Sequence, residues 1–410
     1  MDKNLANDLY FSKEAADYLG ITTQRLNALV KEGKIEPLKK TPSGTIFHID
    51  ELNKRKEEQR IFSKVSQGGG KGMFQLDSKT KIEALNFATL INALEITEQR
   101  LDPQFSDFSE KADVSVPLND STVTDSYVEF FAIGKDRLLR EFAMAERAFS
   151  RLRETDEIIK RGSQDYPPLL AQTEQAPRFL YIRGKKALLF EKRTVALVGS
   201  RQASDKAKEN TQRLTVKLGN NGITIVSGLA KGIDVTAHRE ALRNGFNTIA
   251  VIGTNLNQYY PAENKAVQME IEQKGLVVSQ FSPANKTQRW FFPLRNGVMS
   301  GLSLATVIME AGETSGALKQ ADFALKQGRE VLIPRSALDI KTISWPAKYV
   351  KKGAKVVTYP KDVLELLAES NIFKVDEKYK QQTIEDLLED GKNEPKQSKT
   401  QWIGQMVSGE

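Results

Sequence analysis

Between about residues 190 and 360, short apolar runs rich in β-branched residues alternate with longer stretches of helical periodicity. Several of these runs are apolar at every position, which is typical of strands buried on both faces of a sheet. The alternation predicts a doubly wound α/β fold with a mostly parallel sheet, whose strands are joined by helices. Strands are predicted at 195–198, 223–226, 248–252, 276–278, 305–309, 330–333 and 355–357.

Four glycine-rich or polar turns accompany this pattern, and we place them at the carboxyl ends of the strands, where doubly wound sheets bind ligands. They span residues 199–201, 227–234, 292–296 continuing to 301–303, and 309–317. Backbone N–H groups at a helix start attract anions, and an adjacent arginine adds a bidentate phosphate contact. Each turn alone is compatible with ordinary turn chemistry. Four of them at one edge favour a phosphate-binding site, although no GxGxxG dinucleotide motif is present.

The amino-acid composition excludes most classes of catalytic site. The chain has no cysteine and only two histidines, His48 and His238. Disulfides, thiolate metal sites and cysteine nucleophiles are therefore excluded. Two histidines are also too few for a multi-histidine metal centre and leave little choice of base for a Ser-His hydrolase. No cluster of acidic residues has metal-ligand spacing near the turns. We therefore predict no catalytic residue, no metal and no cofactor, and we interpret the chain as a non-enzymatic protein.

The net charge of +7 is concentrated in residues 151–370, which hold 33 basic and 21 acidic residues. This excess predicts a polyanionic partner such as nucleic acid for that block, and a solvated lysine-rich surface is the alternative. No run approaches the roughly 18 apolar residues of a membrane helix, and the amino terminus lacks the apolar centre of a signal peptide. We therefore expect a cytoplasmic protein without membrane contact.

Residues 1–60 are predicted to form a separate module. A helix follows Ser12, a second follows Thr22, and a hairpin surrounds Pro42–Gly44 before a basic helix. This order resembles the MerR/excisionase-like winged helix-turn-helix family. The resemblance implies that recognition-helix residues face the major groove of duplex DNA and that wing residues reach phosphates. These are Thr22, Thr23, Gln24 and Arg25, and Lys39, Lys40 and Thr41, respectively. A protein-interaction module of the same shape is the alternative.

The rest of the chain divides by composition. A glycine-rich linker is predicted at 61–72 and a helical region at 73–160, with helices at 81–96 and 127–154. An acidic loop rich in Ser, Asp and Pro is predicted between these helices at 101–126. The α/β domain is assigned to 161–370 and a polar tail to 371–410. The helical region is interpreted as either a dimerisation element or a support for the α/β domain.

Motifs in the α/β domain then identify a family resemblance. They are Asp165–Leu170, Pro177–Gly184, Val198–Arg201, Ser227–Asp234, Ala237–Leu242, Tyr260–Pro261, Phe292–Asn296, Gly301–Ser303, Ser315–Leu318 and Gln327–Val331. In order and spacing they resemble the DNA-processing protein A family (DprA, also called Smf) over roughly residues 160–360. The resemblance implies an extended Rossmann-like domain that binds single-stranded DNA in a basic groove, commonly as a homodimer, and that helps to load RecA.

Residue by residue, the resemblance implies that Arg201, Lys231 and Arg295 neutralise phosphates. The full implied DNA- or phosphate-binding set is Gly199, Ser200, Arg201, Ser227, Gly228, Lys231, Gly232, Arg295, Asn296, Ser315 and Gly316. Asp234 is expected to cap the following helix, and Glu310 to orient Arg295 or Lys231 or to bind a ligand hydroxyl. His238 is expected to be structural. Trp290, Phe291 and Phe292 are candidates for base stacking, with core packing expected for at least one of them.

The chain departs from the family pattern at Asn255, Gln280 and Gly297, and we do not expect its short polar tail to form the carboxy-terminal winged helix that is frequent in the family. These departures predict a divergent member that serves a mobile element or a defence role. They also leave an alternative of another class, a sensor or enzyme that binds a nucleotide-like small molecule at the same edge, where Gly297 opens space for a base. A third alternative is a scaffold assembled through the helical region.

Overall fold

The structure is a computed structural model that describes residues 9–19, 22–31, 35, 37–41, 44–49, 51–52 and 78–369. The chain divides into two compact units, Met1–Gly72 and Met73–Glu410, which are described separately. The predicted linker at 61–72, the tail at 371–410 and most of the basic helix expected after Asp50 lie outside the described residues, as do the side chains of Arg25, Lys40 and Thr41.

The first unit consists of two helices and a small antiparallel sheet. Its elements are β1 (Leu9–Phe11), α1 (Ser12–Leu19), α2 (Thr23–Lys31), β2 (Lys39–Thr41) and β3 (Gly44–His48). The two helices and the hairpin lie where the sequence predicts them, whereas β1 was not predicted; it pairs with β3 on the side away from β2. The core of this first unit includes Leu26, Leu29 and Phe47, together with Ala15 and Ala16.

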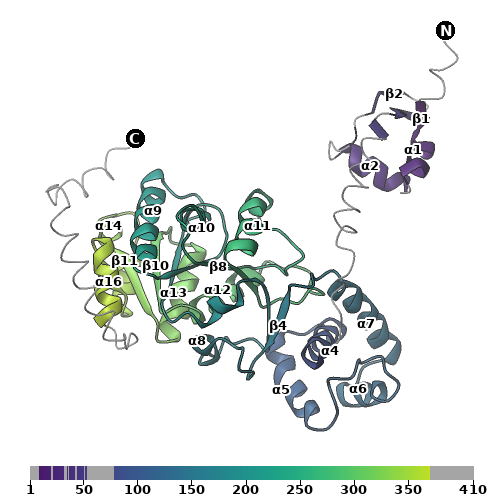
Figure 1. Ribbon diagram of the computed structural model, residues 1–410, viewed down its shortest axis with the longest axis horizontal. Coiled ribbons are helices and arrows are strands. Elements are labelled where there is room, and N and C mark those ends of the chain that lie inside the picture. The colour runs from purple at the N-terminus through teal and green to yellow at the C-terminus, as the bar shows by residue number, and fades with distance from the viewer. Residues whose placement is uncertain are drawn as a thin grey trace. The chain divides into compact units, whose positions relative to one another are not determined.

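The second unit contains a nine-stranded sheet in the order β12-β11-β10-β6-β7-β8-β9-β5-β4. Figure 1 labels β4, β8, β10 and β11 of this sheet. All seven predicted strands are present. They lie side by side in the sheet, and every pairing between two of them is parallel. They are β6 (Thr194–Gly199), β7 (Thr224–Ser227), β8 (Thr248–Val251), β9 (Leu276–Ser279), β10 (Ala305–Glu310), β11 (Glu330–Pro334) and β12 (Lys355–Val357). Two further strands, β4 (Glu157–Lys160) and β5 (Phe179–Gly184), were not predicted, and they extend the sheet in antiparallel pairing beyond β9.

Helices cover both faces of this sheet. In β6, Val195 and Leu197 pack in the core beneath α9 and α10, whereas Ala196 and Val198 pack in the core on the opposite face beneath α12 and α13. The helices that follow the strands are α8 (Pro168–Ala171), α9 (Asp205–Asn220), α10 (Ile233–Arg243), α11 (Lys265–Lys274), α12 (Phe291–Gly301), α13 (Gly316–Lys326), α14 (Arg335–Leu338), α15 (Trp345–Lys351) and α16 (Pro360–Glu369). In the described part of the chain, no helix is long and apolar enough to span a bilayer.

The helical region packs directly on the antiparallel end of the sheet. It contains α4 (Lys79–Leu94), α5 (Glu98–Ser109), α6 (Thr124–Phe131) and α7 (Lys135–Phe149). One hydrophobic core joins residues of these helices, such as Phe87 and Phe149, to Phe179 and Tyr181 of β5. The helical region and the sheet therefore share a core, and the predicted division at 160/161 falls at the end of β4.

The prediction of a loop at 101–126 is wrong for its first part. Residues up to Ser109 belong to α5, in which Leu101, Phe105 and Phe108 share the buried face despite Pro103 inside the helix. The remainder is held by a buried side chain. Asn86 donates from Nδ2 to the carbonyl oxygens of Val114 and Val116 at 2.9 and 2.8 Å, and its Oδ1 accepts from the N–H of Leu118 at 2.9 Å.

The helical pattern predicted over 127–154 is interrupted. Ala132 adopts a left-handed conformation with φ of 48° and ends α6, and Gly134 then precedes α7. The apolar period continues across this break because both helices turn their apolar faces to the same core. Periodicity alone therefore did not reveal the corner.

An ion cluster fastens α4 and α5 to the strands. Asp102 accepts hydrogen bonds from the guanidinium groups of Arg161 and Arg178, and Arg178 also pairs with Glu83. The backbone N–H of Arg178 donates to Glu98 at 2.6 Å. Burial raises the pKa of Glu98 from 4.5 to about 7; the hydrogen bond from Arg178 opposes this shift, and the charge of Asp102 adds to it.

We predict that Glu98 lowers the free energy of unfolding as the pH rises from 4.5 to about 7. A carboxyl group whose pKa is higher in the folded state binds more protons when folded, so its contribution is complete below pH 4.5 and is lost as the pH passes about 7. Between pH 5 and pH 8 the titration of Glu98 should cost the unmodified protein about 1–3 kcal/mol in free energy of unfolding, and Glu98→Gln should not show this decrease. Urea unfolding of both proteins at a series of pH values measures the difference, and parallel pH profiles would contradict the prediction.

Candidate nucleic-acid interface

The candidate site lies where the strand order of the sheet reverses. From β6 the chain proceeds through β7, β8 and β9 on one side and then returns to β10 on the other side of β6. The crevice at the carboxyl ends of such strands is the usual ligand site of doubly wound sheets. We define the rim as residues 199–204, 227–232 and 310–316, which connect β6, β7 and β10 to α9, α10 and α13. The amino-terminal ends of these helices therefore open at the rim, where anions are favoured.

The three segments of the rim are locked together by backbone contacts. The N–H of Ser200 donates to the carbonyl oxygen of Glu310 at 2.7 Å, and the N–H of Ile233 donates to that of Ser200 at 3.3 Å. A Cβ atom at Gly199 would lie 2.5 Å from Cγ1 of Ile233. At Gly232, where φ is 72°, it would lie 2.2 Å from the carbonyl oxygen of Ser200. Both glycines are thus required by packing between loops.

Two predicted cations lie exposed on the rim. Arg201 follows β6 and has no carboxylate partner among the residues that the structure describes. Lys231 follows β7, and its Nζ atom lies 2.6 Å from Oε2 of Glu263, with about half of each side chain exposed. Sequence reasoning missed Glu263 because it follows a different strand, β8. The electrostatic attraction for a phosphate is therefore centred on Arg201.

Arg295 is not on the rim but beneath it, which corrects its predicted contact with phosphate. Residues 292–296 form part of α12 rather than a turn, and only 5% of Arg295 is exposed. Its Nη1 atom donates to the carbonyl oxygens of Gly228 and Val251. A Cβ atom at Gly228 would lie 2.1 Å from Nη1, so the guanidinium fills the space that this glycine leaves. Burial lowers the pKa of Arg295 to about 10, so the group stays charged at neutral pH.

Two acidic residues of the site also differ from their predicted roles. Gly232, not Asp234, precedes α10 as its cap. Asp234 instead accepts from the N–H groups of Ala230 and Gly228; burial raises its pKa, and the charge of Arg295 opposes this rise. Glu310 orients neither Arg295 nor Lys231. Its carboxylate accepts from the N–H and the hydroxyl of Ser204 at 3.1 and 2.6 Å, and so holds the start of α9.

The remaining predicted residues separate into a supporting group and an exposed group. Ser227 is buried and donates to the carbonyl oxygen of Leu197 at 2.6 Å. Asn296 is also buried, and its Nδ2 atom donates to the carbonyl oxygen of Gly316 at 3.2 Å. Ser315 caps α13 by accepting from the N–H of Ala317. The rim surface itself is formed by Gly199, Ser200, Arg201, Lys231, Gly232, Ser315 and Gly316, all of which are partly or fully exposed.

The three aromatic residues at the start of α12 have different environments. Trp290 is 53% exposed. Phe291 stacks on Phe281, with ring centroids 3.9 Å apart and planes within 4°. Phe292 packs against Tyr260 and occupies the space above Gly253, where a Cβ atom would lie 2.5 Å from its ring. Phe291 and Phe292 are therefore half-buried against other aromatic rings, and Trp290 is the most exposed of the three.

Gly297 does not open space for a base, contrary to the expectation from sequence. A Cβ atom there would lie 2.8 Å from Cγ of Gln175, so the position is filled from within the protein. His238 is fully buried and its Nδ1 atom lies 2.8 Å from Oγ1 of Thr248, which confirms its structural role. Burial lowers the pKa of His238 to about 3, and the ring is neutral. Within the described ranges, no group of three or more potential ligands is arranged to hold a metal ion.

Gly232 provides a direct test of the locked rim. We expect Gly232→Ala to destabilise the protein by at least ~3 kcal/mol, because the new methyl group meets the backbone of Ser200 in addition to the cost of a positive φ. Gly245 has the same φ of 72° but open space around it, so Gly245→Ala serves as the control and should cost roughly 1–2 kcal/mol. Equal losses in urea unfolding would contradict the packing argument.

Comparisons with known proteins agree with this geometry. The family model described as DNA recombination-mediator protein A matches residues 157–368. The chain is 32% identical over 266 residues to DNA processing protein DprA of Bacillus subtilis, covering 64% of this chain and 89% of that protein. It is 41% identical over 202 residues to DprA of Streptococcus pneumoniae, covering 48% of this chain and 70% of that protein.

A structural comparison extends the similarity beyond the sequence match. The X-ray structure of DprA from Streptococcus pneumoniae superimposes with a TM-score of 0.54 and 29% identity, and the match covers 70% of this chain and 95% of that one. The fold, the motifs and these relatives lead to the same assignment. The chain belongs to the DNA recombination-mediator protein A family of DNA-processing proteins.

Proposed function

We propose that the chain binds single-stranded DNA across the rim, with the phosphates held by Arg201, Lys231 and the amino-terminal ends of α9, α10 and α13. The observation that carries the proposal is the exposed guanidinium of Arg201, which forms no ion pair with a carboxylate in the described part of the chain, at the crevice where these helices open. A flexible phosphate chain can follow such a surface and be held through its backbone rather than through its base edges. The proposal contains no catalytic step.

The buried residues of α12 have a positioning role in this proposal. Arg295 supports the turn at Gly228, and Asn296 holds the carbonyl oxygen of Gly316. A substitution at Arg295 would therefore reduce binding by displacing the rim and would reduce stability as well. A substitution at Arg201 would reduce binding alone, because its side chain is exposed.

The prediction that tests the proposal compares two exposed cations. Arg201→Ala should lower affinity for a single-stranded oligonucleotide roughly ten-fold and reduce the slope of log affinity against log salt by about 0.7, because one phosphate contact is lost. Lys326→Ala is the control, since Lys326 is exposed in the last turn of α13, at the end away from the rim. Fluorescence anisotropy over a series of salt concentrations measures both effects.

Two results would overturn the proposal: affinity that does not depend on salt, or wild-type affinity in Arg201→Ala. A thermal-shift measurement with mononucleotides covers the alternative function. Stabilisation by a mononucleotide without affinity for an oligonucleotide would support a small-molecule sensor or enzyme at the rim.

We also propose that the first unit contacts duplex DNA through the start of α2. Thr22, Thr23 and Gln24 are exposed there, and Lys39 is exposed on the neighbouring hairpin. A gel shift with duplex and single-stranded oligonucleotides, for the full chain and for a Gln24→Ala variant, addresses this contact. Assembly as a homodimer, cooperation with RecA and a role in a mobile element or in defence stay predictions from the family resemblance.

A further inference from the structure

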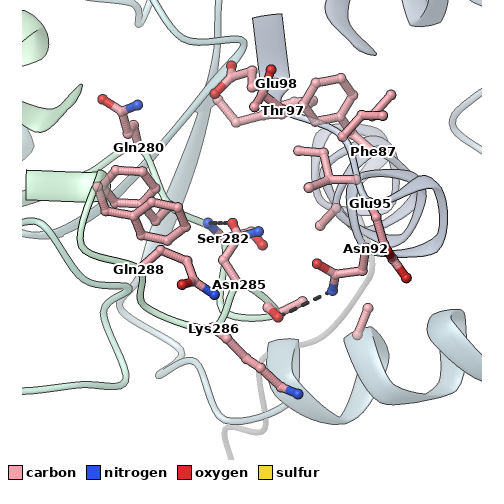
Figure 2. Close-up of a pocket in the computed structure, with 18 of the residues that line it drawn as sticks. Phe87, Asn92, Glu95, Thr97, Glu98, Gln280, Ser282, Asn285, Lys286 and Gln288 are labelled. Carbon is pink, nitrogen blue, oxygen red and sulfur yellow. Dashed lines mark hydrogen bonds between the residues drawn. The ribbon is translucent and has the colours of Figure 1, made fainter. Parts of the chain in front are cut away.

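A cavity of about 690 Å³ lies between the helical region and the loop that follows β9 (Figure 2). Residues of α4, α5 and α7 form one side, and residues 280–291 form the other. The cavity has the size typical of small-molecule sites. It is distinct from the rim, and no residue implied by the family resemblance as a phosphate contact lines it.

One wall of the cavity carries three aromatic side chains. It includes the stacked pair Phe281 and Phe291, with Trp290 set edge-on to Phe291 at an interplanar angle of 86°. Because Trp290 lines the cavity and is also 53% exposed, it lies at the opening. The exposed indole of Trp290 favours stacking of a planar ring.

The opposite wall carries three carboxyl groups among apolar side chains such as Phe87 and Ile91. Glu95, Glu98 and Glu141 line the cavity together with a single cation, Lys286. Glu95 is paired with Arg137 at 2.6 Å. Glu98 accepts one backbone hydrogen bond, from Arg178 to Oε1, which leaves Oε2 for a ligand. Figure 2 shows Glu98 and Gln280 at the cavity wall. The Oε2 atom of Glu98 therefore favours a group that donates an N–H hydrogen bond.

Helix α12 connects the cavity to the rim. Trp290 directly precedes the helix at the cavity opening, and Arg295 supports the rim at Gly228. Five residues of helix correspond to an axial distance of about 7–8 Å. The cavity opening and the support of the rim at Gly228 therefore lie less than two turns apart on one helix.

We propose that this cavity receives a nucleobase with an exocyclic amino group, turned out of a single strand whose phosphates lie on the rim. The inference rests on the proposed function. The ring stacks on the aromatic wall, and its amino group donates to Oε2 of Glu98. Adenine, cytosine and guanine carry such a group, whereas thymine presents carbonyl oxygens and a methyl group in its place. The strand is thus read at one base, and its remaining contacts are to phosphate.

The test compares oligonucleotides of equal length made of dA, dC, dT or abasic units, each with the full-length protein. We expect dA and dC to bind about ten-fold more tightly than dT and abasic strands. Glu98→Gln should abolish this preference, because its amide places a donor against the amino group. Gln retains an oxygen for the N–H of Arg178, and thermal unfolding checks that the variant folds. Trp290→Ala should lower affinity for dA and dC and leave abasic affinity unchanged.

The outcomes separate this inference from the proposed function. Arg201→Ala should weaken all four strands equally, which reports on the rim. Equal binding of the four strands by the wild type, or an unchanged preference in Glu98→Gln, would overturn the cavity proposal and leave the rim proposal intact. Absence of binding to every strand would overturn both. Adenosine or cytidine is titrated separately, and saturation by the free nucleoside without binding of any strand would make the cavity a small-molecule site and overturn its role in strand reading.

Discussion

The buried guanidinium of Arg295 is the interaction on which the geometry of the rim depends. Its charge is removed from water, and two carbonyl oxygens at the ends of neighbouring strands, those of Gly228 and Val251, accept from Nη1, whereas the buried Nε atom has no hydrogen-bond partner among the described residues. Because Gly228 has no side chain, the guanidinium lies directly against the turn. Asp234 accepts from the same turn on its other side. The loop carrying Lys231 is therefore held by a charged pair inside the protein, and its surface is left for a ligand.

The helical region has a comparable dependence on buried polar groups. Asn86 holds the segment after α5, and the cluster of Glu83, Asp102 and Arg178 fastens α4 and α5 to the antiparallel strands. Polar contacts of this kind fix the orientation of two layers, but they do not fill the space between them as interlocking apolar side chains do. The cavity next to Glu98 lies where this junction meets the loop after β9. The rim and the cavity are linked through α12, and the helical region supplies one side of the cavity.

Much of the fold follows from local patterns. The seven parallel strands were predictable because their apolar runs are short, rich in β-branched residues and separated by helical periods. The strands β4 and β5 were missed because they pair in antiparallel fashion at the end of the sheet, where Arg183 in β5 and its buried partner Asp156 break the apolar pattern. Helix α5 was missed because Ser, Asp and Pro residues obscure the spacing of Leu101, Phe105 and Phe108. In each case a contact with a distant segment outweighs the local composition.

The sequence by itself determined the fold class, the family and the edge of the sheet at which the glycine-rich turns gather, because these depend on the order and spacing of residues along the chain. Only the tertiary structure decided which charges face the solvent. Arg201 and Arg295 both belong to family motifs, yet one is exposed on the rim and the other is buried beneath it. Burial is set by the segments that pack around a residue, here the turn at Gly228 and the end of β8, and those neighbours come from distant parts of the chain.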